Sequence, residues 1–306
     1  MSLYTERHGM RSPIEKTYTI SIKAYSLLYD CCERYFEYIA WKYPAQCPDG
    51  LGCCGLDFFK FSEDMEFEIP TLFRRDGVID KPRTTKRVFD DTPKDDEYNQ
   101  YALFDLIEFV TQNMKDITRR IPHSYYRHED LSFGNTNGIA ESFIKDINAI
   151  FEKVGLLYCL TTNLEIERIE ETAVLSEEIV SNISAIKETG LKELLITAIQ
   201  KHKSPYPADQ KDAVEKIWDA LERLKTYYTT LDKKASVTQI VNDIASGQTS
   251  YIDLFNLEFK ALTDIGNNYR IRHHETNKID ITDIRHYDYF FNRCLSLIGT
   301  AIQYLK

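Results

Sequence analysis

The sequence predicts a mainly α-helical protein in two parts: a helical N-terminal domain with a small β-hairpin, followed by an antiparallel helical bundle. Apolar residues recur at helical spacing over several long segments. Glycine and proline, which interrupt helices, are scarce, with 12 and 9 residues in a chain of 306. The 20 tyrosines indicate an aromatic-rich interior.

Composition and charge exclude several classes of protein. The chain is 43% hydrophobic and 28% charged, as globular proteins are, and no apolar run reaches the roughly 18 residues that span a bilayer. The N-terminal residues lack an apolar signal core, so we expect a cytoplasmic protein with no membrane partner. The net charge of -10 argues against a broad face for duplex nucleic acid but leaves room for a small local phosphate site.

The first part, residues 1–172, is predicted to contain three helices. They cover residues 18–43, ended by Pro44, then Tyr98 to about Arg120, ended by Pro122, and finally Ile139 to Lys153. Residues 44–57 are rich in turn formers and predict an ordered loop, whereas the charged residues 74–97 predict a mobile surface loop.

A β-hairpin is predicted at residues 155–169. Apolar and polar residues alternate there on both sides of Thr162 and Asn163, a pair that suits a turn. After the hairpin the chain changes character, which places a domain boundary after residue 172 and a bundle over 173–306. The bundle's apolar stripes are Ala213, Val214, Ile217, Trp218, Leu221 and Leu224, then Phe255, Phe259, Leu262 and Tyr269, and finally Tyr287, Phe290, Phe291, Cys294, Leu297, Ile298, Ala301 and Leu305.

The strongest candidate site is a cluster of arginine and histidine after the second of these stripes. Arg270, Arg272, His273 and His274 occur within five residues, near the end of a predicted amphipathic helix. On such a helix Arg270 and His274, four residues apart, share one face. Cleavage of a phosphodiester without a metal requires a cation that holds the phosphate and a group that exchanges a proton, and arginine and histidine supply both.

Several motifs resemble those of AbiJ-type abortive-infection proteins. They are Glu6-Arg7-His8-Gly9, the hairpin Val154–Ile169, the segment Glu215–Lys225 with Trp218, and the segment Gly266–Glu275. The resemblance covers most of the chain, and its C-terminal motifs are the distinctive ones. It implies an AbiJ-type N-terminal domain at 1–172 and a HEPN-like bundle at 173–306.

HEPN-like domains are helical bundles, often dimeric, and many are metal-independent ribonucleases of bacterial defence. The resemblance therefore implies a bacterial anti-phage toxin that binds or cleaves transfer or messenger RNA, forms a homodimer, and answers to an antitoxin or a phage trigger. Arg270, His274, Arg272 and His273 would be its catalytic residues. The hallmark of HEPN-like domains is an arginine and a histidine separated by four to six residues, whereas three residues separate Arg270 from His274.

Two further groups are candidates for binding. Arg119, His123, Arg127 and His128 flank two tyrosines and would contact single-stranded RNA, although an aromatic loop with a structural role explains the same pattern. The cysteines Cys31, Cys32, Cys47, Cys53 and Cys54 lack the paired Cys-x-x-Cys spacing typical of structural zinc. We therefore expect no metal and no cofactor.

Two functions of different classes remain open. The first is a metal-independent ribonuclease or RNA-binding toxin that acts through the Arg/His cluster. The second is a non-catalytic helical module for interaction or dimerisation, with a regulatory role. The short Arg270–His274 spacing and the acidic net charge favour the second.

Overall fold

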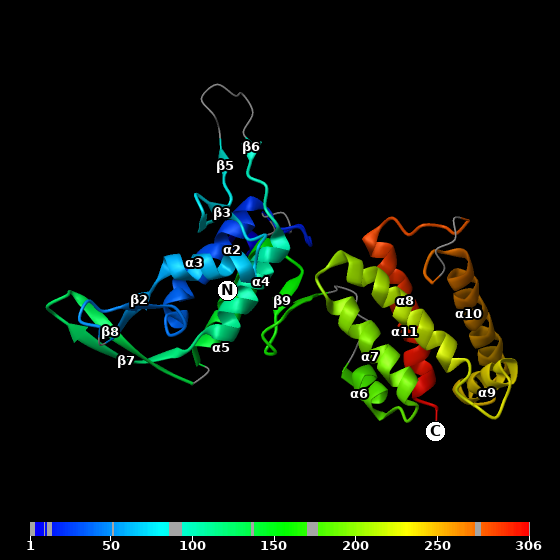
Figure 1. The fold of residues 1–306 in the computed structure, drawn as a ribbon. Helices are drawn as coiled ribbons and strands as arrows, with labels where there is room; N and C mark the ends of the chain where they lie inside the picture. Colours follow the sequence, from blue (N-terminus) through cyan, green and yellow to red (C-terminus); the bar gives the residue numbers. More distant parts are fainter. Residues whose placement is uncertain are drawn as a thin grey trace. The chain divides into compact units, whose positions relative to one another are not determined.

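The computed structural model describes residues 4–8, 10, 14–50, 52–85, 94–135, 138–169, 177–272 and 277–305. The chain divides into two compact units, Met1–Ile169 and Glu170–Lys306, and each has a hydrophobic core of its own (Figure 1). The boundary expected after residue 172 falls among residues 170–176, outside the described residues. Helices make up most of the regular structure, so the mainly α class is confirmed.

The core of the first unit is helical. Its helices α2, α4 and α5 pack on one another through side chains that recur at helical spacing. The helix predicted across 18–43 is present as a helix and a following 3₁₀ turn, and the one predicted at 139–153 is also confirmed. The helical bounds in this unit are α1 Tyr4–Arg7, α2 Ile22–Tyr35, η1 Phe36–Ile39, α3 Phe58–Glu68, α4 Gln100–Asn113 and α5 Gly138–Val154.

Tyrosines fill much of this core, as their number predicts. Because a buried hydroxyl costs free energy unless it is hydrogen-bonded, several of them reach backbone carbonyls of distant segments. The Tyr29 hydroxyl donates to the carbonyl of Ile79 at 3.2 Å. The Tyr158 hydroxyl donates to the carbonyl of Tyr18 at 2.8 Å. These bonds join α2 and the hairpin to segments far away in the sequence.

A four-stranded antiparallel sheet extends from the helices of this unit (Figure 1). Its strands lie in the order β1, β2, β8, β7, with bounds β1 Pro44–Gln46, β2 Cys53–Leu56, β7 Asp116–His123 and β8 His128–Gly134. The helix predicted from Tyr98 to Arg120 is therefore wrong at its C-terminal end, because α4 stops at Asn113 and the next residues pair as a strand. The loop predicted at 44–57 contains the two short strands β1 and β2.

The hairpin predicted at 155–169 is confirmed as β9 Tyr158–Leu160 paired antiparallel with β10 Ile166–Arg168. Gly155 enters it with a φ of +75°, a conformation that favours glycine. A Cβ on Gly155 would lie 2.4 Å from the carbonyl oxygen of Glu15. Glycine at this position therefore lets the segment before α2 lie against the hairpin, where the Thr17 amide donates to the carbonyl of Gly155 at 3.0 Å.

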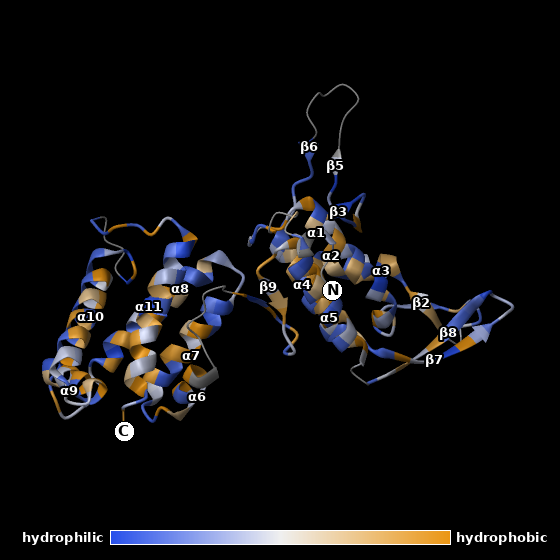
Figure 2. Ribbon diagram, turned by 180° about the vertical axis from the view of Figure 1, so that it is seen from behind, coloured by the Kyte–Doolittle hydropathy of each residue, from blue (hydrophilic) through white to orange (hydrophobic). Residues whose placement is uncertain are grey.

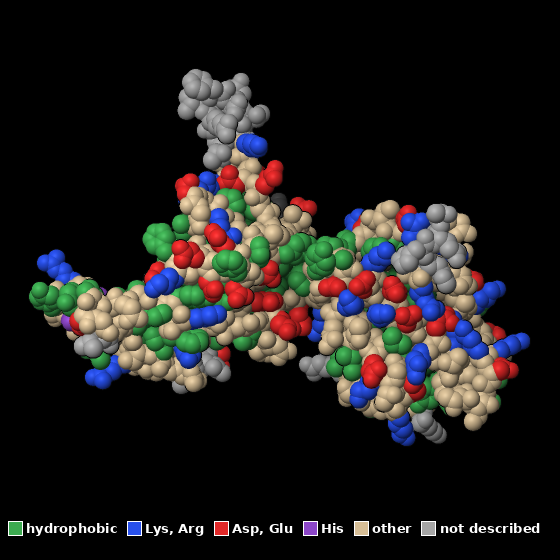
Figure 3. Space-filling view, in the orientation of Figure 1, with side chains coloured by type: hydrophobic (Ala, Val, Ile, Leu, Met, Phe, Trp, Pro, Cys, Tyr) green, Lys and Arg blue, Asp and Glu red, His purple; other side chains and the backbone are tan. Residues whose placement is uncertain are grey.

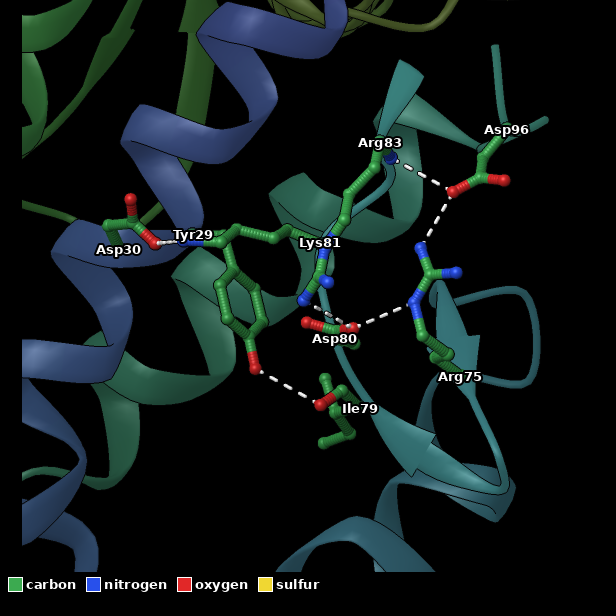
Figure 4. Close-up of polar contacts among 8 residues, drawn as sticks. All are labelled: Tyr29, Asp30, Arg75, Ile79, Asp80, Lys81, Arg83 and Asp96. Carbon is green, nitrogen blue, oxygen red and sulfur yellow. Dashed lines mark hydrogen bonds and ion pairs between the residues drawn. The ribbon is translucent and has the colours of Figure 1, made fainter. Parts of the chain in front are cut away.

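The charged segment predicted to be a mobile surface loop contains short strands within its described residues, 74–85 and 94–97. It forms two short hairpins, with strands β3 Arg74–Arg75, β4 Val78–Ile79, β5 Thr84–Thr85 and β6 Lys94–Asp95. Figure 4 shows Arg75 between two carboxylates, at 3.0 Å from Asp80 and 2.7 Å from Asp96. The Arg83 amide and the Arg75 guanidinium lower the pKa of Asp96, so this carboxylate stays charged and connects the two hairpins.

The second unit is a bundle of helices around Trp218. The predicted stripe on α8 is buried, and the hydrophobic residues of α8, α10 and α11 stand out in Figure 2. The helices are α6 Glu177–Ala185, α7 Thr189–Lys203, α8 Pro207–Leu224, α9 Lys233–Ala245, α10 Thr249–Asn268 and α11 Ile284–Ile302. Within the described part of the chain, no helix combines the length and the apolar character required to cross a membrane.

Replacement of Gly266 should destabilise the second unit. A Cβ on Gly266 would lie 2.5 Å from Nε1 of Trp218, a side chain that is 1% exposed and donates to the carbonyl of Leu262 at 3.1 Å. Because the indole cannot move away in a packed core, we expect Gly266→Ala to lower the free energy of unfolding by about 1–3 kcal/mol. Hydrogen exchange of peptides from α8 and α10 would measure this change.

The control is Asn256→Ala, at an exposed position of α10. It should shift the free energy by less than about 0.5 kcal/mol. Equal protection of α8 in Gly266→Ala and the unchanged chain would contradict the packing argument.

The stability of the second unit should fall at acid pH through Glu188. This carboxylate caps α7, accepting from the amides of Gly190 and Leu191, and pairs with Arg223 at 2.7 Å. The Arg223 hydrogen bond is the largest of the effects that lower its pKa from 4.5 to about 2. Because the folded state holds the proton less tightly than the unfolded one, the stabilisation is complete above the unfolded pKa and is lost as the pH falls toward 2.

Glu188→Gln is therefore expected to destabilise the chain by about 1 kcal/mol at pH 7. The difference should shrink as the pH is lowered from about 5 to about 2. Urea unfolding followed by circular dichroism at a series of pH values would measure it, with Asp253→Asn on the exposed side of α10 as the control. A penalty that stays constant over this pH range would refute the assignment.

Candidate functional site

The two arginines of the predicted Arg/His cluster follow α10 and are not part of it. The helix ends at Asn268 with Tyr269 as its C-cap, so Arg270 and Arg272 lie in the segment after the helix. The prediction that Arg270 lies on a helix, where it would share a face with His274, is therefore wrong, because Arg270 is not helical. His273, His274 and Glu275 lie outside the described residues.

We call Tyr269–Arg272 the arginine segment. Its first residues are fixed by backbone hydrogen bonds, because the Arg270 amide donates to the carbonyl of Ile279 at 2.8 Å and the Ile279 amide donates to Asn268 at 3.0 Å. Ile271, 2% exposed, packs into the core of the second unit. The residues around Ile279 thus lie beside the end of α10. Ile271 anchors the two arginines that precede and follow it in the sequence.

Both guanidinium groups of the arginine segment form ion pairs. Arg270 Nη1 lies 2.7 Å from Asp280 Oδ1, and Arg272 Nε lies 2.9 Å from Oδ1 of Asp219 on α8. The side chains of Arg270 and Arg272 are 29% and 36% exposed, so solvent reaches both of them. Ion pairs of this kind contribute about 0–1 kcal/mol to stability. They therefore orient a guanidinium, and another anion can still replace the carboxylate.

The second predicted group lies on the β7–β8 hairpin, which the structure forms in place of a helix end and a loop. The structure brings His123 and His128 together, as they face each other across the turn with ring centroids 5.1 Å apart. Arg119 is paired in register with Ser132. It precedes His123 by four residues, so the two lie about 13 Å apart along the strand. Arg127 lies in the turn with a φ of 58°. Arg119 therefore lies apart from the paired histidines along the strand, whereas Arg127 belongs to the turn that joins them.

Hydrophobic and basic side chains gather at the free end of this hairpin, with histidine among them (Figure 3). Tyr125 and Tyr126 of the turn are 84% and 37% exposed. The ring of Tyr126 stacks on that of His128, with an angle of 12° between their planes. The exposed tyrosines offer flat apolar surface, which is suited to stacking on an unpaired base or to contact with a protein.

Cys47, His123, His128 and Asp130 converge at this end of the sheet, and we call them the hairpin cluster. Each offers one ligand atom, and the four atoms lie within 4.8 Å of one another. Cys47 Sγ lies 3.4 Å from His123 Nδ1, which lies 3.4 Å from Asp130 Oδ2. His128 Nε2 lies 3.2 Å from Asp130 Oδ1. The cluster joins strands β7 and β8 to the turn after β1.

The turn after β1 places Cys47 in this cluster. The Cys47 amide donates to the carbonyl of Gly52, and the Gly50 amide donates to the carbonyl of Cys47, both at 2.8 Å. Cys47 is 2% exposed. Burial raises the pKa of its thiol, and the neighbouring Asp49 carboxylate raises it further. A cation bound beside the sulfur would reverse both effects by stabilising the thiolate.

The other cysteines considered for zinc do not converge. Cys54 Sγ donates to the carbonyl of Ala45 at 3.3 Å, and Cys53 Sγ donates to that of Gly55 at 3.4 Å. Cys31 and Cys32 are buried within α2. All seven cysteines of the chain are free thiols in the structure.

Sequence reasoning missed the hairpin cluster because its members come from segments about 76 residues apart. A signal was nevertheless present, since His123 and His128 flank a four-residue stretch with turn character. Only a strand pairing that places the two histidines opposite each other turns this pattern into a site.

Comparisons with known proteins returned nothing: no family model matches the chain, and no curated protein or solved structure was found to be similar to it. Function is therefore inferred from the residues of the arginine segment and of the hairpin cluster.

Proposed function

We propose that the chain is a cytoplasmic bacterial anti-phage protein that binds RNA, and cleaves it without a metal, through the arginine segment and the histidines that follow it. The observation that carries this proposal is the pair of partly exposed arginine side chains on either side of the anchored Ile271. Two planar cations fixed on one short segment suit the two non-bridging oxygens of a phosphodiester.

The ion pairs of the arginine segment are compatible with this role. A carboxylate orients each guanidinium in the absence of RNA, and a phosphate carries the same charge and a similar arrangement of oxygens. Because Asp280 is 57% exposed, its pairing with Arg270 is screened by water and is easily exchanged. Binding of a phosphate would then cost little beyond the loss of one weak ion pair.

Cleavage would follow the chemistry open to RNA alone. The ribose 2′-oxygen attacks phosphorus, its proton passes to a general base, and the 5′-oxygen leaves with a proton from a general acid. His274 and His273 are assigned these proton transfers from the sequence, and Arg270 and Arg272 stabilise the additional negative charge of the transition state. The products are a 2′,3′-cyclic phosphate and a 5′-hydroxyl, and DNA is inert because it lacks the attacking group.

Incubation of the full-length protein with total transfer and messenger RNA would test this function. We expect cleavage that persists in a chelator and leaves 2′,3′-cyclic phosphates, and that falls roughly 100-fold or more in His274→Ala. Arg270→Ala should also lose cleavage. A single 2′-deoxy substitution at the cut site of the RNA should abolish cleavage by the wild-type chain. The measurements are initial rates on a labelled RNA and mapping of the product ends.

His286→Ala is the matched control, because His286 is exposed in the same unit and lies outside the arginine segment. It should cleave at the unchanged rate. RNA left intact by the wild-type chain, both alone and in cells under phage infection, would refute the ribonuclease.

A specific observation favours a second function, a non-catalytic module for dimerisation or partner binding. Tyr251, Leu254 and Leu257 on α10 are 49%, 54% and 66% exposed. At intervals of three residues they lie on one side of the helix and form a continuous apolar stripe. Apolar surface of this kind is typical of protein interfaces.

We expect the combined change Leu254→Glu and Leu257→Glu to convert a dimer to a monomer. Two carboxylates in an apolar contact would lose their hydration without gaining partners, which opposes association. Light scattering after gel filtration at several protein concentrations would measure the mass. The control is Asp253→Ala with Asn256→Ala, two exposed polar positions on the same helix. A wild-type chain that stays monomeric at every concentration would contradict this function.

A further inference from the structure

We propose that the hairpin cluster is a zinc site, in which Cys47, His123, His128 and Asp130 bind one Zn²⁺ and fix the free end of the β1–β2–β8–β7 sheet. The proposal concerns the first unit and stands independently of the ribonuclease assigned to the second.

The distances among the ligand atoms fit a tetrahedral ion. With zinc bonds of about 2.0–2.3 Å, neighbouring ligands of a tetrahedral site lie roughly 3.3–3.6 Å apart. The separations from Cys47 Sγ to His123 Nδ1, and from there to Asp130 Oδ2, are both 3.4 Å. His128 Nε2 and Asp130 Oδ1 are 3.2 Å apart. The four ligand atoms as a set lie within 4.8 Å of one another, so binding of the ion would draw the remaining pairs closer together.

The donor set selects among metals. A thiolate and two imidazoles are soft or borderline ligands, which suit zinc and disfavour Mg²⁺ and Ca²⁺. Four protein ligands also close the coordination sphere, as in structural zinc sites, and leave no open position for substrate. Binding would release the Cys47 proton to solvent, since the thiolate is the ligand.

The burial pattern of the sheet shows why a metal that links its strands would stabilise it. Among the described residues of 44–57 and 116–134, only Cys47 and Leu131 are buried. Neither belongs to the main core of the first unit. A small sheet without an apolar layer has little to hold it together, and a bound metal supplies the missing stabilisation.

The surroundings of the cluster also match a metal site. His123 Nε2, the ring nitrogen turned away from Cys47, lies 3.7 Å from Asp49 Oδ2. A carboxylate beside the second nitrogen of a ligating histidine fixes its tautomer and increases its basicity. A Cβ on Gly52 would lie 2.8 Å from Asp130 Oδ1, so the absence of a side chain there leaves room for the carboxylate of Asp130.

The first experiment measures the metal in the full-length chain, purified without a polyhistidine tag. We expect about one Zn²⁺ per chain by elemental analysis. After removal of zinc by a chelator, titration with Co²⁺ alone should produce the visible bands of tetrahedral cobalt together with a thiolate-to-cobalt charge-transfer band. Added Zn²⁺ should abolish both sets of bands, and Mg²⁺ should not.

Variants identify the ligands. Cys47→Ser should lose the charge-transfer band, and His128→Gln should bind Co²⁺ at least roughly tenfold more weakly. Asp49→Asn and Gly52→Ala, which alter the surroundings and not the ligands, should weaken binding by about tenfold. The controls are Cys54→Ser on β2 and His286→Gln in the second unit, and both should bind Co²⁺ as the unchanged chain does.

A third measurement does not depend on the folding of any variant. Hydrogen exchange of the unchanged chain, with chelator and with Zn²⁺, should show slower exchange in peptides from 116–134 when zinc is present. Exchange in α7 and α8 of the second unit should be the same in both. Full retention of the charge-transfer band in Cys47→Ser would overturn the proposal. So would a purified chain with less than about 0.1 ion that also fails to bind Co²⁺.

Discussion

Within the described parts of the chain, no apolar layer covers the free end of the β1–β2–β8–β7 sheet, and the placement of its polar side chains follows from this constraint. Most residues of β7 are exposed, and Leu131 is the buried residue of β8. A sheet that cannot be held by hydrophobic contact must be held by directed interactions. The hairpin cluster supplies them where the turn after β1 meets the ends of β7 and β8. A second directed contact lies nearer the helices, where the Arg120 guanidinium pairs with Glu37 of η1.

The helical part of the first unit, in contrast to the sheet, is held together mainly by hydrophobic contacts. There most of the apolar residues of α2, α4 and α5 are buried, and several polar side chains form single hydrogen bonds to distant segments. The hydroxyl of Tyr18 donates to the carbonyl of Ile169 at 2.9 Å, which joins the start of the unit to its last residue. The guanidinium of Arg168 lies over the ring of Tyr18 at 4.3 Å. The unit is therefore closed by contacts between its two ends.

The sequence predicted the elements whose signal is local and missed those whose partners are distant. The stripes on α8 and α11 and the alternation at 155–169 are periodic over a single segment, and all three were predicted correctly. The helical spacing of apolar residues extends to Met114 and Pro122 is the next helix stop, so the sequence predicts a helix that continues past Asn113. Ile117 and Ile121 instead belong to a strand, and only pairing with β8 reveals it. The hairpin cluster, which depends on that pairing and on Cys47, was out of reach for the same reason.

The end of α10 was misread for a different reason. Its apolar spacing continues to Tyr269, and Asn267 and Asn268 are weak signals for a helix end. The backbone bonds between Arg270 and Ile279 compete with another helical turn, and they determine where the helix stops. The burial of Ile271 adds to this competition, because a hydrophobic anchor outside the helix stabilises the returning chain.

The arginine segment also sets a limit on how RNA would be bound. Its two guanidinium groups can neutralise about two phosphates, which for a single strand is a small electrostatic contribution at physiological salt. A net charge of -10 adds long-range repulsion to any RNA that approaches. Useful affinity therefore requires more than one copy of the segment or a stacking surface for bases. A dimer supplies the first of these, because two-fold symmetry doubles every phosphate contact without a new residue. The two proposed functions are in this sense complementary, because the proposed ribonuclease would need association, whereas an interaction module would need no phosphate contact at all.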